Sequence, residues 1–102
     1  MPEVPIIERI DPDLEELMER FLKSSKDDLI KMQSAVDTKD FETLSRLGHT
    51  AKGTGYGYGF KGMGDIGVDL ENAAKASNEA EVHAQVERMV YYLDNVKIEF
   101  GE

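Results

Sequence analysis

Eight of the nine glycines in this 102-residue chain fall between Leu44 and Ala74, yet the residues around them keep helical spacing. At about 100° per residue, one side of such a helix collects small and apolar residues, namely Leu44, Leu47, Gly48, Ala51, Gly55 and Tyr58. Each glycine inside a helix costs about 1 kcal/mol relative to alanine, so three or more need a compensating reason. Gly48 and Gly55 on the inner side indicate close packing of a neighbouring helix. Strand alternation is the competing interpretation of TGYGYGF (54–60), but the flanking segments are helical and no partner strand is evident.

The opposite side of the same helix is polar and carries His49, one of only two histidines in the chain. Lys52 and Gly53 follow three and four residues later, so both fall one turn away on the same face. Because glycine has no side chain, another macromolecule could approach the imidazole closely. The polar face also includes Ser45, Arg46 and Tyr56, which we expect to contribute to a docking surface, whereas Tyr58 should point inward.

Apolar residues spaced by three and four continue along the chain and predict four helices. We expect these helices at about residues 12–36, 41–58, 60–77 and 79–98, after a short N-terminal arm at residues 1–10. Residues suited to capping stand before three of them: Asp11 with Pro12 next, Asp40 or Thr38, and Asn78 with Glu81 as a capping box. Four amphipathic helices with short turns and no convincing strand predict an all-α antiparallel four-helix bundle, with the whole chain as one domain.

The apolar positions of each helix give the expected core. The first helix should bury Leu14, Leu17, Met18, Phe21, Leu29, Met32 and Val36, with Leu22 and Ile30 off the centre of the stripe. The later helices should bury Met63, Ile66, Leu70, Ala73, Val82, Val86, Met89, Val90, Leu93 and Val96. Val4, Ile6, Ile7 and Ile10 of the arm could lie against the bundle.

Composition excludes several classes of function. The net charge of −9 argues against nucleic acid and anionic membranes as partners, because both attract clusters of Lys and Arg. The absence of cysteine removes disulfides and thiolate chemistry, and it fits the reducing cytoplasm where we expect the protein. No apolar run approaches the roughly 20 residues that span a bilayer, and residues 1–13 lack the pattern of a secretory signal. Two distant histidines, His49 and His83, make a metal site an unfavourable interpretation, and we expect His83 at the surface.

The segment from His49 to Glu71 resembles the histidine phosphotransfer (HPt) domain family. The family pattern is a histidine, a lysine three on, a glycine four on, a second glycine ten on and then an apolar helix, here His49, Lys52, Gly53, Gly59 and then Met63, Ile66 and Leu70. The segment is also similar to the phosphoacceptor domain of chemotaxis-type histidine kinases, in which a glutamate twenty-two residues after the histidine helps to orient the imidazole. Glu71 has that offset. The glycines after Lys52 are denser than the family pattern requires, which leaves the helical register at residues 56–62 open.

The resemblance implies a phosphoryl group that His49 accepts from an aspartyl-phosphate of a response-regulator receiver domain, or from a histidine kinase, and passes on. Lys52 would compensate charge on the phosphoryl oxygens. If Glu71 or a water accepts a hydrogen bond from Nδ1–H, the lone pair is left on Nε2, the nucleophile. Such transfer depends on in-line positioning and charge compensation, with magnesium supplied by the partner. GTGYGYG (53–59) lacks the GK[ST] ending of a P-loop, so we expect a monomeric phosphocarrier with no cofactor or ATP site of its own, and not an enzyme.

Two interpretations stay open. The first is a phosphocarrier in a multistep phosphorelay, either free-standing or cut from a larger kinase. The second is a non-catalytic helical bundle that binds a receiver or a scaffold and is not phosphorylated. The role of Glu71 is also open, because a glutamate at the edge of an apolar stripe could equally be a surface residue.

Overall fold

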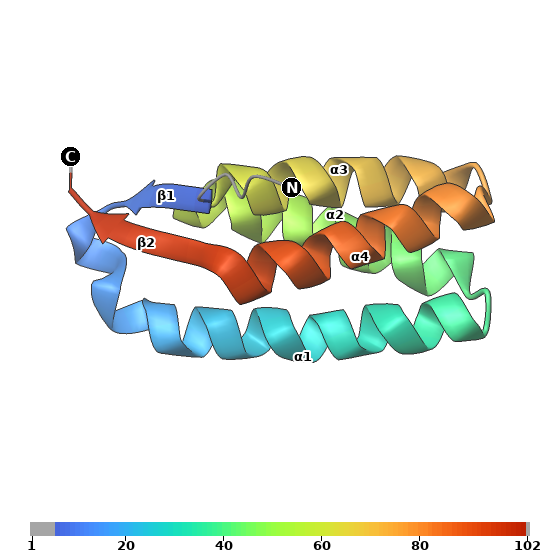
Figure 1. Cartoon of the computed structure of the whole chain (residues 1–102), viewed down its shortest axis with the longest axis horizontal. Helices are drawn as coiled ribbons and strands as arrows, with labels where there is room; N and C mark the ends of the chain where they lie inside the picture. Colours follow the sequence, from blue (N-terminus) through green and yellow to red (C-terminus); the bar gives the residue numbers. More distant parts are fainter. Residues whose placement is uncertain (1–5, 102) are drawn as a thin grey trace.

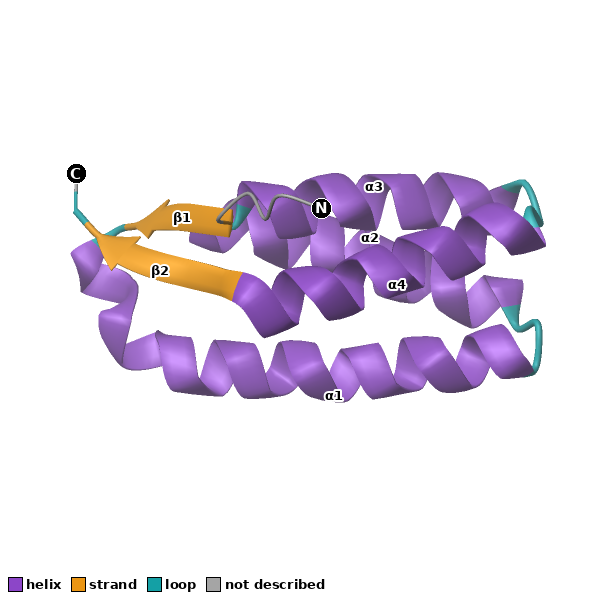
Figure 2. Ribbon diagram, viewed as in Figure 1, coloured by secondary structure: helices purple, strands orange, loops and turns teal. Residues whose placement is uncertain are grey.

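The computed structural model of the chain describes residues 6–101, which form an elongated bundle of four helices (Figure 1). The elements are strand β1 (Ile6–Ile10), a 3₁₀ segment η1 (Pro12–Leu17), helices α1 (Met18–Asp37), α2 (Phe41–Tyr58), α3 (Lys61–Lys75) and α4 (Glu79–Asn95), and strand β2 (Val96–Phe100). Successive helices run in opposite directions and are joined by short turns (Figure 2). The predicted all-α four-helix bundle with a short N-terminal arm is confirmed. None of the helices in residues 6–101 is long and apolar enough to cross a membrane.

The expectation of no strand is wrong at both ends of the described chain. Strands β1 and β2 pair in parallel, with Ile6 opposite Val96 and Ile10 opposite Phe100. Helix α4 therefore ends at Asn95, before the predicted boundary near residue 98. The sequence VKIEF of β2 alternates apolar and charged residues and contains β-branched and aromatic side chains, which favour a strand once a partner is available.

The first predicted helix is divided. Residues 12–17 form the 3₁₀ segment, and α1 begins only at Met18. Asp11 caps this start as predicted, because its Oδ1 accepts a hydrogen bond from the Asp13 N–H at 2.9 Å. The tighter 3₁₀ winding changes the phase of the side chains. Leu17, expected in the core, is 41% exposed, whereas Met18 and Phe21 are buried.

The other N-caps are as predicted. Asp40 Oδ1 accepts from the Thr43 N–H at 3.1 Å at the start of α2, and Asn78 Oδ1 accepts from the Glu81 N–H at 3.1 Å at the start of α4. A full capping box also needs the Glu81 side chain to accept from the Asn78 N–H. Here the Glu81 carboxylate accepts a hydrogen bond from the Gln85 side-chain amide instead.

The core runs along the bundle axis and draws on all four helices and β1. Its buried apolar side chains are Ile10, Met18, Phe21, Met32, Ala35, Leu44, Ala51, Phe60, Met63, Ile66, Leu70, Ala73, Ala74, Val82, Val86, Met89, Tyr92 and Leu93. Five side chains expected among these are only half-buried, namely Leu14, Leu29, Val36, Val90 and Val96. The sequence left the burial of Ile7 and Ile30 open, and the structure exposes them at 50% and 64%. Val4 lies outside the described residues.

Strand β1 is fixed to the bundle by a buried carboxylate. Glu8 Oε2 accepts hydrogen bonds from the Tyr92 hydroxyl of α4 at 2.6 Å and from the Gly62 N–H in the first turn of α3 at 2.7 Å. Burial, together with this bond to Glu8, raises the pKa of the Tyr92 hydroxyl. The N-terminal strand is thereby held at one end of α3 and α4.

Helices α2 and α3 make the most extensive contact between helices, and glycines explain it. A Cβ on Gly48 would lie 2.7 Å from the Glu71 backbone nitrogen, and one on Gly55 would lie 2.6 Å from that of Gly64. On the facing helix, a Cβ on Gly67 would lie 2.5 Å from the backbone nitrogen of Lys52. The predicted packing role of Gly48 and Gly55 is confirmed, and it brings the backbone of Glu71 against α2.

Candidate functional site

His49 projects from the exposed side of α2, with 67% of its side chain accessible, and its Nδ1 lies 3.2 Å from Glu71 Oε2 on α3. Glu71 is buried at the seam between the helices, so the alternative of a surface glutamate is wrong. The contact exists because Gly48 and Gly67 allow the two helices to approach closely. Within residues 6–101, no hydrogen bond engages the other ring nitrogen, Nε2.

The Glu71 carboxylate is shared by two lysines as well as by His49. Lys75 Nζ lies 3.1 Å from Oε2, and Lys52 Nζ lies 3.4 Å from Oε1. The hydrogen bond from Lys75, with a smaller contribution from the charge of Lys52, holds the pKa of Glu71 below its usual range even though burial opposes this. Glu71 is therefore ionised near neutral pH and can only accept hydrogen bonds.

An ionised acceptor selects the tautomer of the imidazole. The contact between Nδ1 and Oε2 is favourable when Nδ1 carries the proton, because a carboxylate has no proton to donate. A neutral His49 in this arrangement keeps its lone pair on Nε2. A nucleophile at Nε2 requires this state of the ring.

Lys52 lies beside His49, but it is less exposed than its position on the helix suggests. Its side chain is 37% accessible, and its ammonium contacts Glu71. A phosphoryl group on Nε2 would have to share Lys52 with that carboxylate.

Lys75 was not identified from the sequence. It stands four residues after Glu71 in the last turn of α3, with a side chain that is 64% accessible. Spacing of i and i+4 between an acidic and a basic residue on one helix is the signal that could have found it.

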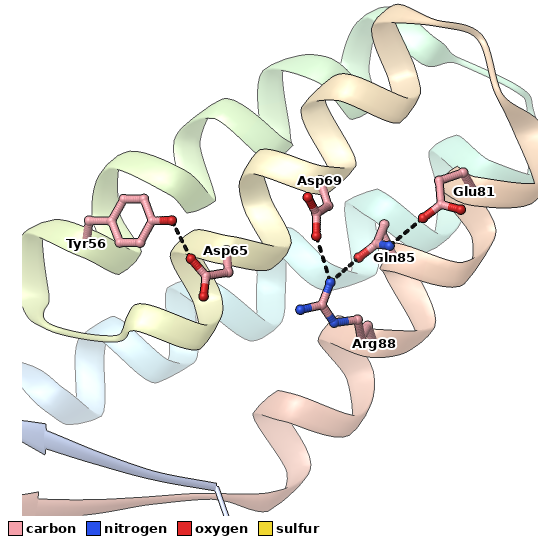
Figure 3. Close-up of polar contacts among 6 residues, drawn as sticks. All are labelled: Tyr56, Asp65, Asp69, Glu81, Gln85 and Arg88. Atoms are coloured by element: carbon pink, nitrogen blue, oxygen red, sulfur yellow. Dashed lines mark hydrogen bonds and ion pairs between the residues drawn. The ribbon is translucent and has the colours of Figure 1, made fainter.

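The expected docking residues differ in their surroundings. A Cβ on Gly53 would meet nothing within 4 Å, so the surface beside His49 is open there. Arg46 and Tyr56 are exposed, whereas Ser45 is half-buried. The Tyr56 hydroxyl donates to Asp65 Oδ1 at 2.5 Å, which ties α2 to α3 and raises the pKa of Tyr56 (Figure 3).

The neighbouring face of α3 and α4 carries a second polar network. Arg88 Nη1 donates to Asp69 Oδ2 at 2.9 Å and to Gln85 Oε1 at 2.7 Å, and Gln85 in turn contacts Glu81 (Figure 3). These residues link α3 to α4 and do not contact His49. The other histidine, His83, is exposed on α4, and no three His, Asp or Glu side chains in residues 6–101 are placed to hold a metal ion.

The model of the Hpt domain family matches residues 16–97, and the chain therefore belongs to this family. Searches of the curated proteins and of the solved structures give no significant match. Membership confirms the resemblance noted in the sequence and establishes histidine phosphotransfer in a phosphorelay as the general role. Hpt domains are phosphocarriers rather than catalysts, and as a family they interact with receiver domains and histidine kinases.

Proposed function

We propose that His49 accepts a phosphoryl group on Nε2 and exchanges it with an aspartate of a response-regulator receiver domain. The observation that carries this proposal is the contact between His49 Nδ1 and the buried Glu71 carboxylate at 3.2 Å. The contact favours a proton on Nδ1, which leaves the lone pair on Nε2 of an imidazole that is 67% accessible to a partner.

In this step one bond to phosphorus forms as another breaks, and no third reactant is consumed. The lone pair of Nε2 attacks the phosphorus of the aspartyl-phosphate, and the bond from phosphorus to the aspartate oxygen breaks with its electron pair returning to the carboxylate. The imidazole gains positive charge as the new N–P bond forms. Glu71 stabilises that charge through the hydrogen bond from Nδ1–H, and the reverse step returns the phosphoryl group by the same route.

The remaining residues have two roles, which are to compensate the charge of the phosphoryl group and to dock the partner. Lys52 compensates charge on the phosphoryl oxygens, and the exposed face formed by Arg46, Gly53 and Tyr56, with the half-buried Ser45 at its edge, receives the receiver domain. The partner supplies magnesium, and this chain works as a monomer in the cytoplasm with no cofactor or ATP site of its own. A kinase domain is the alternative donor on the same face.

The test is transfer of label from a phosphorylated receiver to the protein and to two matched variants. Wild type and His83→Gln should both become labelled, because His83 is an exposed histidine away from the site. His49→Gln should keep its fold and take up no label. The label should be lost in acid and kept in alkali, as expected of a phosphoramidate.

Three results would contradict the proposal: label that survives acid, label that maps to Ser45, Thr50 or Thr54, or equal labelling of His49→Gln. Binding of the receiver with no labelling of the wild type would support the alternative of a non-catalytic binding bundle.

A further inference from the structure

A groove of about 520 Å³ lies between α1 and α4, and it shares no residue with the His49 site. Its apolar lining includes Val36 of α1 and Val86 and Val90 of α4. In Figure 1, α1 and α4 run antiparallel along the length of the bundle. Residues 83–95 of α4 follow the groove, a length of about 18 Å at 1.5 Å per residue.

The borders of the groove are acidic. Asp37 lines it from α1, and Glu87 and Asp94 line it from α4. None of the lining residues in the described part of the chain is a lysine or an arginine, and His83, 3.7 Å from Glu87, stands at one end. The groove is thus an apolar depression with negative charge on both sides.

Two exposed large apolar side chains, Tyr91 and Ile30, belong to this surface. Tyr91 lines the groove and is 42% exposed. Ile30, at 64% exposure, lies three and seven residues before Gln33 and Asp37 of the groove, so it continues the same face of α1. An isoleucine this exposed buries no core surface here, and it is available to a partner.

We propose that the groove between α1 and α4 binds a basic amphipathic helix of another protein. A helix of about four turns matches the length of the groove, and its apolar residues at i, i+3 or i+4 and i+7 would meet the valines, Tyr91 and Ile30. Lysines or arginines on its flanks would face Asp37, Glu87 and Asp94. An extended peptide has no basis here, because both walls are helices whose backbone groups are already bonded.

Charge argues against two other occupants of the groove, a second copy of this chain and an anionic membrane. A second copy of this chain would bring another net charge of −9 against an acidic surface, and an anionic membrane would be repelled in the same way. A basic helix is attracted. Because the groove uses α1 and α4 while His49 and Glu71 lie on α2 and α3, such a partner and a receiver could bind together.

The test titrates the full ¹⁵N-labelled chain with a synthetic helical peptide of about 14 residues, with leucines on one face and lysines on its flanks. We expect saturable shifts confined to the groove, at Gln33, Val36, Val86 and Val90, and weaker binding at higher salt. A peptide with the same composition in permuted order and a peptide with glutamate in place of lysine serve as controls, and neither should bind measurably.

Two charge-reversal variants distinguish binding at the groove from attraction by the net charge of the protein. Glu87→Lys/Asp94→Lys should weaken binding of the lysine peptide about tenfold or more, whereas Glu15→Lys/Glu16→Lys, with the same change in net charge, should weaken it less than about threefold. Equal effects of the two variants, equal binding of the control peptides, no saturable binding, or shifts centred on α2 and α3 would each overturn the proposal. Groove shifts that depend on protein concentration without peptide would assign the groove to a second copy and would also overturn it.

Discussion

Beside the exposed His49, the imidazole and two lysines converge on the Glu71 carboxylate. In the proposed function Glu71 selects the tautomer, and the hydrogen bond from Lys75 and the charge of Lys52 lower the pKa of Glu71. The two lysines differ in position, because Lys52 stands one turn from His49 on α2 and Lys75 lies on α3. Their contributions to phosphoryl transfer can therefore be separated.

Lys52→Ala should lower the transfer rate about tenfold or more, equivalent to at least about 1.4 kcal/mol of barrier. The reason is that the docked receiver excludes water, so an ammonium beside the phosphoryl oxygens acts in a lower dielectric than at a free surface. Lys75→Ala should cost less than about fivefold, since an exposed ion pair is worth roughly 0–1 kcal/mol. Both rates are measured at saturating receiver. Equal rates for Lys52→Ala and wild type would leave Lys52 as an ordinary surface residue.

Gly53 offers a second test on the same face. Because a Cβ there meets nothing within 4 Å, Gly53→Gln should fold normally and gain up to about 1 kcal/mol in free energy of unfolding, the usual cost of a helical glycine. Its side chain should block the docked receiver and slow transfer strongly.

Gly57→Gln is the matched control for Gly53→Gln, since Gly57 is also helical and equally open but lies one further turn from His49. It should give a similar gain in stability and a smaller loss of transfer. A sharp fall in stability of Gly53→Gln with normal transfer by the folded fraction would make Gly53 a packing residue.

At the scale of elements, one buried side chain links the N-terminal strand to the helices. Glu8 is the acceptor that joins β1 to α3 and α4, and its loss would leave the Tyr92 hydroxyl and the Gly62 N–H without this partner. We expect Glu8→Ala to lower the free energy of unfolding by about 1–3 kcal/mol. Amide exchange in β1 and β2 should speed up more than exchange in the centre of α2.

Glu8→Gln is the conservative control, because its amide oxygen still accepts hydrogen bonds. It should lose less stability than Glu8→Ala in the same urea titration. If the two variants unfold alike, or if β1 keeps its protection in Glu8→Ala, then the strand is held by its apolar contacts and its pairing with β2.

The elements also show what a sequence can and cannot predict. Helices α2 and α3 follow from local periodicity, and the tight contact at Gly48 follows from its inward phase. Strand β2 does not follow from local periodicity, because its partner β1 is about ninety residues away in the sequence. Five alternating residues after a helix can also be interpreted as a continuation of that helix.

The same distinction holds within the site. His49, Lys52 and Glu71 could be found by spacing along the chain, although their roles stay predictions. Glu8 meets Gly62 and Tyr92 only in the packed bundle, 54 and 84 residues along the chain, and nothing in its local sequence requires those contacts. The contact of Lys75 with Glu71 is local, at i and i+4 of α3, but only the packing of α3 on α2 places this pair beside His49.

At the scale of the whole molecule, acidification acts in two opposite directions. The chain has 21 acidic and 12 basic residues, so protonation of exposed carboxylates relieves self-repulsion as pH falls. Glu71 and Asp40 oppose this, because each has a pKa in the folded state below its usual value, Glu71 through the hydrogen bond from Lys75 and Asp40 through hydrogen bonds from Thr43. The pH profile of the wild type mixes both effects.

Comparison with Glu71→Gln isolates the ion cluster. A carboxyl whose pKa is depressed by folding stabilises the native state fully above its unfolded value, here 4.5, and loses that contribution as pH falls through the folded value. The difference in free energy of unfolding between wild type and Glu71→Gln should therefore be constant from pH 6 to 7 and shrink at about pH 4.5 and below. Urea titrations of both proteins across this range measure it. A difference that does not vary with pH would mean that Glu71 contributes through packing at the seam of α2 and α3, with the charges of Lys52 and Lys75 playing no part in stability.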